Sequence, residues 1–160
     1  MFREMSINFD NKPVSKAELM EVLEKQPRGI LAVLGDDDYP YCMPLDFWYS
    51  REENRIYFHS GLKGHKVDAI KKHDKICFCV CNEGYREDGD WALNIISVIA
   101  FGKAVIVDDY EKAMDIVRQL SYKFTGDDDY IEGEIEDIGR ETLVFGLEIE
   151  HITAKLVNES

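Results

Sequence analysis

Apolar residues follow two periods along this chain, one typical of helices and one typical of strands. The first helical run extends from Leu19 to Leu23 and lies directly behind Ser15-Lys16-Ala17-Glu18. That tetrapeptide is a capping box, in which the Ser15 and Glu18 side chains each accept a hydrogen bond from the other residue's backbone N–H. The pattern predicts an N-terminal helix over about residues 15–26, which Pro27 ends.

Two later runs also have helical spacing. Residues 65–73 predict a short helix after a glycine-containing loop, with Val67, Ala69 and Ile70 facing inward. Residues 110–124 predict a longer helix that ends before Gly126. The acidic segment that follows, residues 127–139, fits either a short helix or a loop. The inward stripe of the longer helix consists of Ala113, Met114, Ile116, Val117 and Leu120.

Short apolar runs separated by polar turns predict about six strands. A turn of Gly35 and three aspartates joins the first two strands as a hairpin. Pro40 and Pro44 each remove a backbone donor from the second strand, so this strand cannot pair in the ordinary way along both edges. Gly102 predicts a bend in the fifth strand. The six runs are residues 29–34, 39–49, 55–59, 75–80, 92–107 and 143–156.

These elements predict a mostly β protein with peripheral α-helices. A chain of 160 residues fits one domain, and no repeat, low-complexity tract or linker divides residues 1–160. Closing a mostly antiparallel sheet into a barrel protects its edges. We therefore expect a small β-barrel of about six antiparallel strands with helices around it.

The charge of the chain narrows the classes of partner. A net charge of −13 argues against general binding to nucleic acids or anionic membranes, because both require a basic surface. No segment approaches the length of apolar chain that a membrane span needs, and the first residues lack the apolar core of a signal peptide. We expect a cytoplasmic protein, whose late acidic segments form a solvated face rather than a partner surface.

Cysteines are concentrated in one predicted strand. Cys77, Cys79 and Cys81 alternate with Phe78 and Val80, so the three thiols share one face. Residues two apart on a strand are too distant for an ordinary disulfide, and the spacing differs from that of zinc knuckles. We predict no metal site, and we interpret these thiols, together with Cys42, as reduced, buried, small apolar fillers.

The strongest chemical signal is a cluster of polar residues where a strand ends, a loop turns and a helix begins. A helix N-terminus with free backbone donors, a hydroxyl group and cations suits a phosphate group. A capped helix with solvent-exposed cations explains these residues equally well. Asp46 is a candidate partner for a histidine of the cluster, either as an acid that orients a base or as a structural ion pair. The cluster comprises His59, Ser60, Lys63, Gly64, His65 and Lys66.

Four motifs in order resemble the nitroimidazole-resistance branch of the pyridoxamine 5′-phosphate oxidase-like flavoproteins. The resemblance extends from about Ser15 to Lys155. Each motif alone is weak, and their shared order makes the family assignment specific. The motifs are the capped N-terminal helix, Tyr39-Pro40-Tyr41-x-x-Pro44-Leu45-x-Phe47-x-Tyr49, Ile56-Tyr57-Phe58-His59-Ser60-x-x-x-Gly64-x-Lys66 and Ser97-Val98-Ile99-x-Phe101-Gly102-Lys103-Ala104.

This resemblance implies an FMN-binding split β-barrel that forms a homodimer, with FMN in a groove at the subunit interface. By analogy, Met43, Pro44, Leu45 and Asp46 lie along the flavin ring. Ser97 approaches from a neighbouring strand, and His59 delivers a proton or contacts the substrate. The ribityl chain and phosphate are expected at His59, Ser60, Lys63, Gly64, His65 and Lys66.

The implied function is that of an FMN-dependent oxidoreductase that reduces small nitroaromatic compounds such as 5-nitroimidazoles. The alternatives are a flavin- or haem-binding carrier or sensor without turnover and, ranked lower, a pyridoxamine 5′-phosphate oxidase, because no Arg-rich second phosphate site is evident. The chain departs from the branch at Asn94-Ile95-Ile96, where relatives often carry a basic or aromatic residue. Trp91 fits either flavin-edge packing or the core, and we expect the core.

Overall fold

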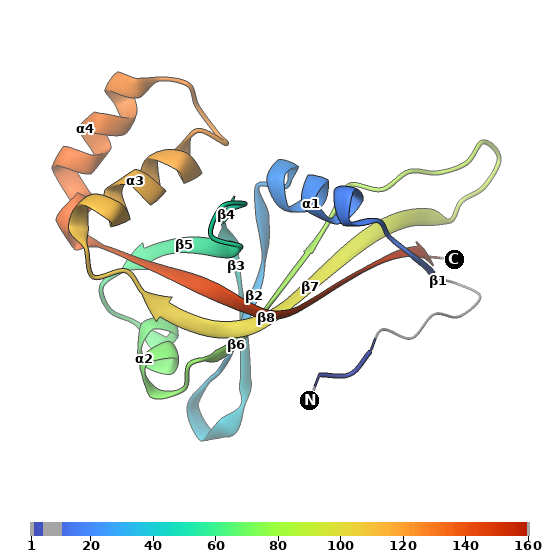
Figure 1. Ribbon diagram of the computed structural model, residues 1–160, viewed down its shortest axis with the longest axis horizontal. Coiled ribbons are helices and arrows are strands. Elements are labelled where there is room, and N and C mark those ends of the chain that lie inside the picture. Colours follow the sequence, from blue (N-terminus) through green and yellow to red (C-terminus); the bar gives the residue numbers. More distant parts are fainter. Residues whose placement is uncertain (1, 5–10, 160) are drawn as a thin grey trace.

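The computed structural model describes residues 2–4 and 11–159, which form one curled antiparallel sheet with four α-helices around it (Figure 1). Within these residues, no helix is long and apolar enough to cross a membrane. The strands are β1 (Asn11–Pro13), β2 (Arg28–Leu34), β3 (Pro40–Asp46), β4 (Trp48–Ser50), β5 (Arg55–Gly61), β6 (Lys75–Cys81), β7 (Leu93–Ile106) and β8 (Thr142–Glu159). The helices are α1 (Lys16–Lys25), α2 (His65–Lys72), α3 (Tyr110–Ser121) and α4 (Asp128–Ile138).

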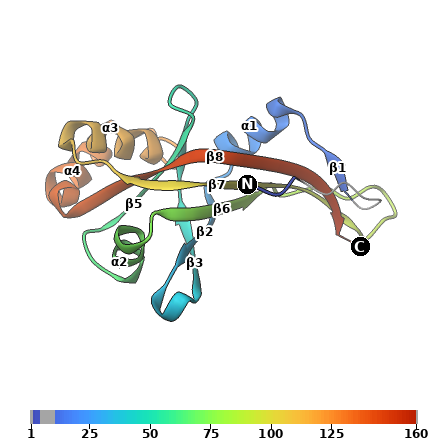
Figure 2. The same ribbon diagram turned by 60° about the horizontal axis from the view of Figure 1, so that its bottom comes forward.

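The strands follow the order β3-β2-β6-β7-β8-β5-β4 across the sheet, and β1 pairs with β8. The sheet curls into a half-barrel, as the view in Figure 2 shows. The prediction of a mostly β split barrel is therefore confirmed. The strand number differs from about six because the predicted run 39–49 divides into β3 and β4, and because β1 adds a short strand.

One residue joins the two outermost strands. β3 and β4 lie at opposite ends of the strand order, yet only Phe47 separates them in sequence. Phe47 is fully buried and packs edge-on against Phe78, with 4.9 Å between ring centroids. The chain therefore crosses from one edge of the sheet to the other at Phe47, which holds the two edges together.

The position of β3 explains its two prolines. Among the described strands, β3 pairs only with β2, so its other edge carries no strand partner. An edge strand tolerates the missing N–H groups of Pro40 and Pro44. The expectation that this strand is not paired along both edges is confirmed.

The helices begin where the sequence predicts. Ser15 caps α1, and the reciprocal hydrogen bonds of the capping box join Ser15 and Glu18 at 2.9 and 3.2 Å. In α2, the three predicted inward residues are buried. The acidic segment forms α4 rather than a loop, because Asp127 caps its first turn while Ile131 and Ile135 are buried.

Two hydrophobic clusters lie on the two faces of the sheet. The inner cluster fills the half-barrel and includes Leu23 of α1, Phe47 and Phe145. The outer cluster packs α3 and α4 against the other face, with Tyr57 and Met114 fully or almost fully buried. Strand β5 is consequently buried on both sides. The helical pair α3–α4 covers only one part of the outer face (Figure 2).

Gly102 bends β7 as predicted. The register between β7 and β8 shifts between Phe101 and Gly102. A Cβ atom at position 102 would lie only 1.9 Å from the carbonyl oxygen of Glu148. Only glycine permits this approach of the two backbones, and the resulting irregularity lets the long strands curve.

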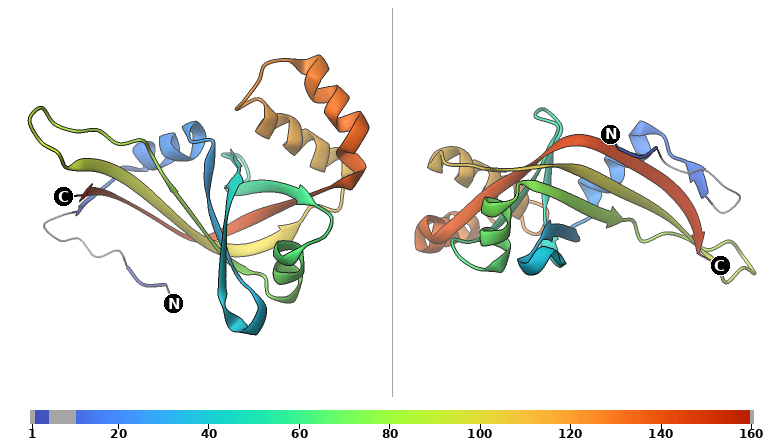
Figure 3. Two further views of the ribbon diagram at one scale, coloured as in Figure 1. Left: turned by 180° about the vertical axis from the view of Figure 1, so that it is seen from behind. Right: turned by 90° about the horizontal axis from the view of Figure 1, so that it is seen from below.

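Two predictions of burial are wrong. The cysteines alternate as expected, but Phe78 and its neighbours Ile76 and Val80 take the core face, so that Cys79, Cys81 and Cys42 are exposed and Cys77 is half-buried. Burying Ile76, Phe78 and Val80 removes more apolar surface from water than burying the cysteines, so these larger side chains occupy the inner face. Trp91 is 73% exposed rather than part of the core, because it lies in the long loop between β6 and β7, which extends past α1 at the end of the sheet away from α3 and α4 (Figure 3).

Replacing Phe47 by alanine should lower the free energy of unfolding by about 3–5 kcal/mol, because the substitution leaves a cavity at the joint of the barrel. Urea denaturation followed by circular dichroism measures this loss. Tyr39→Ala is the matched control, since Tyr39 is 75% exposed. Equal stability losses in the two variants would contradict the role assigned to Phe47.

Candidate functional site

A candidate site lies along the split of the barrel, where the unpaired edge of β3 comes close to β5. Asp46 at the end of β3 and Lys66 in the first turn of α2 both lie near enough to His59 on β5 to influence its protonation. The edge strand β3, the strand β5 near the other edge of the sheet and one helix N-terminus therefore converge here. The predicted residues at positions 43–46 and 59–66 belong to these three elements and the loop between them.

The four predicted residues of β3 alternate between the inner and the outer face of the sheet. Met43 and Leu45 pack against the inner cluster, so only their backbone is available outside. Pro44 faces outward and is exposed, and Asp46 lies on the same face of the strand. Any ring along this edge would meet the Pro44 and Asp46 side chains and the unpaired backbone of the strand.

Asp46 forms an ion pair with Arg28 on the neighbouring strand, with 2.7 Å between Oδ1 and Nε. Its expected partnership with a histidine takes a weaker form: the Asp46 charge favours protonation of His59 without a hydrogen bond among the described contacts. The alternative pairing with His65 does not occur. His65 instead stacks on Tyr41 at 4.2 Å and lies 3.6 Å from the carboxylate of Asp36.

His59 is exposed near the end of β5. Loss of hydration lowers the pKa of His59 below its ordinary value, the Asp46 carboxylate opposes this shift, and the Lys66 ammonium adds to it. Because the loss of hydration outweighs the attraction to Asp46, the imidazole is neutral at neutral pH. Such a group is suited to exchange a proton with a bound molecule.

The loop before α2 is open around its two glycines. A Cβ atom added at Gly61 or Gly64 would meet nothing within 4 Å. Gly64 has a φ of 126°, which residues other than glycine rarely adopt. Within the described part of the chain, no side chain caps the first turn of α2. The free N–H groups of that turn are thus available to an anion.

Three side chains surround this loop. Lys66 is half-buried, and burial lowers the pKa of its ammonium group. Lys63 is exposed, and the Ser60 hydroxyl donates to the carbonyl of Gly61 at 2.7 Å. The donors, the cations and the open space suit a phosphate group.

Ser97 does not join this group within one chain. It lies on β7, opposite Cys81 on one side and Lys155 on the other. Strands β2 and β6 separate β7 from β3, and β8 separates β7 from β5. Within one chain, Ser97 therefore does not lie on a strand next to β3 or β5.

Sequence reasoning missed Lys123, which follows α3. Its Nζ donates to the carbonyl oxygens of Gln26 at 2.6 Å and Phe47 at 2.9 Å, and lies 3.9 Å from the centroid of the Phe47 ring. Burial lowers the pKa of Lys123 to about 8, and the nearby Asp46 opposes this shift. No local motif signals the contact, because 76 residues separate Lys123 from Phe47.

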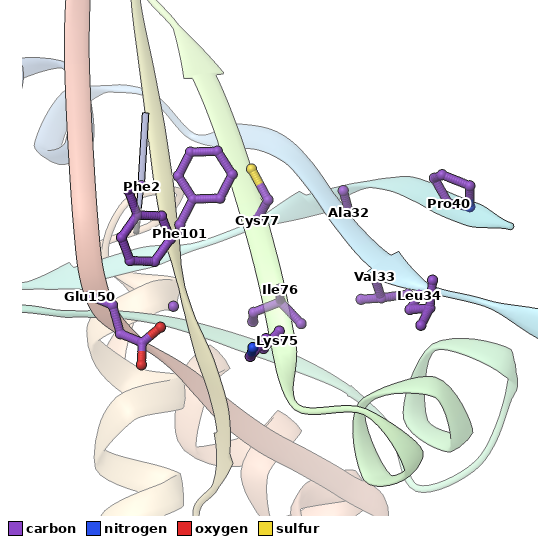
Figure 4. A pocket seen from close by; sticks show the side chains of 11 residues that line it. Phe2, Ala32, Val33, Leu34, Pro40, Lys75, Ile76, Cys77, Phe101 and Glu150 are labelled. Atoms are coloured by element: carbon purple, nitrogen blue, oxygen red, sulfur yellow. The ribbon is translucent and has the colours of Figure 1, made fainter. Parts of the chain in front are cut away.

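An apolar cavity of about 380 Å³ lies on the outer face of the sheet, across β3, β2, β6 and β7 (Figure 4). Phe2 forms part of its wall and stacks on His151, with 4.9 Å between ring centroids. The side chains that line it include Ala32, Leu34, Pro40, Cys77 and Phe101, with Lys75 and Glu150 at its rim (Figure 4). None of residues 59–66 lines this cavity.

The cavity belongs to a wider uncharged area, which we name the outer strip. The register of the sheet places its members in two rows across five strands, and neither row contains Asp, Glu, Lys or Arg. In a chain with 32% charged residues, such a strip indicates a covered surface rather than a solvated one. The rows are Pro44-Ile30-Cys79-Ile99-Thr153 and Cys42-Ala32-Cys77-Phe101-His151.

The family model for pyridoxamine 5′-phosphate oxidase matches residues 15–156. The chain therefore belongs to the pyridoxamine 5′-phosphate oxidase family, as the ordered motifs indicated. Comparison with curated proteins gives no significant match.

Solved structures share the fold at low sequence identity. A Bacteroides thetaiotaomicron protein named for a proposed role in 5-nitroimidazole antibiotic resistance is 16% identical with a TM-score of 0.75, covering 99% of this chain and 97% of its own. An FAD-binding protein from Mesorhizobium loti is 18% identical with a TM-score of 0.66, and the match covers 92% of this chain and 98% of that protein. The flavocytochrome Anf3 from Azotobacter vinelandii is 20% identical with a TM-score of 0.65, and the match covers 92% of this chain and 68% of the flavocytochrome.

Two substitutions should move the pKa of His59 in opposite directions. Asp46→Asn removes a charge that favours protonation and should lower this pKa, whereas Lys66→Met removes a repelling charge and should raise it. An NMR titration of the imidazole proton resonances measures both shifts against the unsubstituted protein. Shifts of the same sign would rule out the proposed arrangement of these three groups.

Proposed function

We propose that this protein is an FMN-dependent oxidoreductase that reduces small nitroaromatic compounds. The observation that carries the proposal is the convergence of the uncapped, open start of α2 with the free, outward edge of β3 across the split of the barrel. FMN needs both features at once, one for its phosphate and one for its flat ring. Membership of the family and the flavin-binding structural neighbours support the same cofactor class.

In such a site, residues of α2, β3 and β5 have separate roles. Bound FMN supplies the redox chemistry, since it accepts and gives up electrons. Lys66 and the free N–H groups of α2 hold the phosphate, while Pro44, Asp46 and the backbone of Met43 and Leu45 orient the ring. His59, kept neutral by its surroundings, exchanges protons with the substrate.

A carrier or sensor that binds flavin or haem without turnover is the second candidate. The flavocytochrome among the structural neighbours favours it, because that protein shares the fold. Oxidation of NADH or NADPH with a nitroaromatic acceptor separates the two candidates. Bound flavin that neither nucleotide reduces would favour the carrier. Pyridoxamine 5′-phosphate oxidation ranks lower, for want of a second phosphate site rich in arginine.

The outer strip supports a homodimer with the flavin groove at its interface. Pro44 belongs both to the outer strip and to the predicted ring-binding segment, so a second copy seated on the strip would lie beside the groove. Ser97, which lies on the same face of β7 as Ile99, would then come from the second subunit. A cytoplasmic location fits the acidic composition of the chain and remains part of the proposal.

The purified protein should show the visible absorbance of bound FMN, directly or after reconstitution. Ser60→Ala combined with Lys66→Ala should weaken FMN binding about tenfold or more, since hydrogen bonds to a charged group are lost. Quenching of FMN fluorescence measures the affinity. The control is Lys72→Ala, which removes a charge from the opposite end of α2. Absence of FMN binding by the unsubstituted protein would refute the proposed function.

Ile99→Glu should convert the dimer to a monomer, because it places a charge in the middle of the outer strip. Sedimentation velocity at micromolar concentration measures the change in mass. Ile138→Glu serves as the control, because Ile138 is exposed at the end of α4. If the unsubstituted protein sediments as a monomer at high concentration, the proposed interface is wrong.

A further inference from the structure

The turn between α3 and α4 is fixed to the joint of the barrel. Lys123 donates to the carbonyls of Gln26 and Phe47 and stacks its cation over the Phe47 ring. Because Phe47 directly follows Asp46, this contact places the turn beside the segment that we assign to the flavin ring. In Figures 1 and 3 the same connection reaches from the helical pair toward α1 and β4.

The two residues that flank Lys123 carry exposed aromatic rings. Tyr122 is 47% exposed and Phe124 is 51% exposed. The backbone of the turn is itself ordered by hydrogen bonds, since the N–H groups of Tyr122 and Phe124 donate to Arg118 and Ser121. Two large apolar rings are therefore held at the surface on a fixed segment, although exposure of such rings is unfavourable.

The surroundings of these rings restrict what they would bind. The Tyr122 hydroxyl donates to the carboxylate of Asp128 at 2.7 Å, which fixes this ring and makes it the hydrogen-bond donor. Asp127 and Asp129 lie next to that carboxylate in sequence and add negative charge. These carboxylates disfavour an anionic ligand, whereas a flat, uncharged aromatic ring would gain contact with the exposed rings.

We propose that Tyr122 and Phe124 form the substrate-facing wall of the flavin groove and receive planar, uncharged aromatic compounds, with Lys123 as the positioning residue that holds this wall beside Asp46. The inference rests on the proposed function and adds to it the part of the chain that selects the substrate. The continuity of the turn with the Asp46 segment, through Lys123 and Phe47, gives the rings their place at the groove.

The test uses the FMN-loaded protein and 2-methyl-5-nitroimidazole as the probe. Tyr122→Ala and Phe124→Ala should each raise the dissociation constant of the probe about threefold to tenfold, which is the range expected for loss of one aromatic contact. Equilibrium dialysis gives this constant without turnover. In the reductase assay, KM should rise by the same factor while kcat and the affinity for FMN stay within about twofold.

Ile138→Ala is the matched control, because it removes another exposed apolar side chain from the same helical pair. Its dissociation constant for the probe should equal that of the unsubstituted protein. Lys123→Met should raise KM as the ring substitutions do, because it releases the turn from the carbonyls of Gln26 and Phe47. The two ring variants keep the inference testable where Lys123→Met fails to fold, since both rings are exposed.

Failure of the inference and failure of the proposed function give different results. If the protein binds FMN but both ring variants retain the original dissociation constant, or the unsubstituted protein does not bind the probe, the inference is overturned and the flavin site stands. If the protein binds no FMN, the proposed function is wrong and the inference falls with it. A matching rise in both ring variants, with the control unchanged, supports the substrate-facing wall.

Discussion

The connection through Phe47 is the constraint on which the rest of this structure depends. An open sheet exposes the donors and acceptors of its two edge strands, and those edges need protection. Here the chain itself ties them together, because β3 ends one edge, β4 begins the other, and one buried residue lies between. The barrel is closed by a covalent link at one end and remains split along the rest of β3. That split is where the candidate site lies.

The same connection explains why distant segments meet. Because the sheet must curl to bring β3 next to β5, Asp46 and His59 become neighbours, although β2, β6, β7 and β8 lie between their strands in the sheet. Lys123 donates to the carbonyls of Gln26 and Phe47, so the turn between α3 and α4 is attached to the chain where the two sheet edges meet. The electrostatics of the groove therefore depend on parts of the chain that only the closed barrel brings together.

Local patterns predicted the elements, because their causes are local. The capping box fixes the start of α1, and apolar spacing identifies the buried faces of α2 and α3. The choice between two faces of one strand is different, since alternation places Cys77 and Phe78 on opposite faces but does not say which face is inside. Burial of the larger side chains decides it. The contact of Lys123 with Phe47 and the distance of Ser97 from β3 depend on strand order, which no short window of sequence contains.

The outer face of the sheet shows how one surface serves two needs. Where α3 and α4 cover it, Tyr57 and Val144 are buried against helices of the same chain. Where they do not, the outer strip remains apolar and free of charged residues, in contrast to the strongly acidic remainder of the molecule. Acidic segments of two copies repel each other, whereas a face without charged residues adds no such repulsion. The proposed homodimer would therefore use this face, and its second subunit would lie next to Pro44.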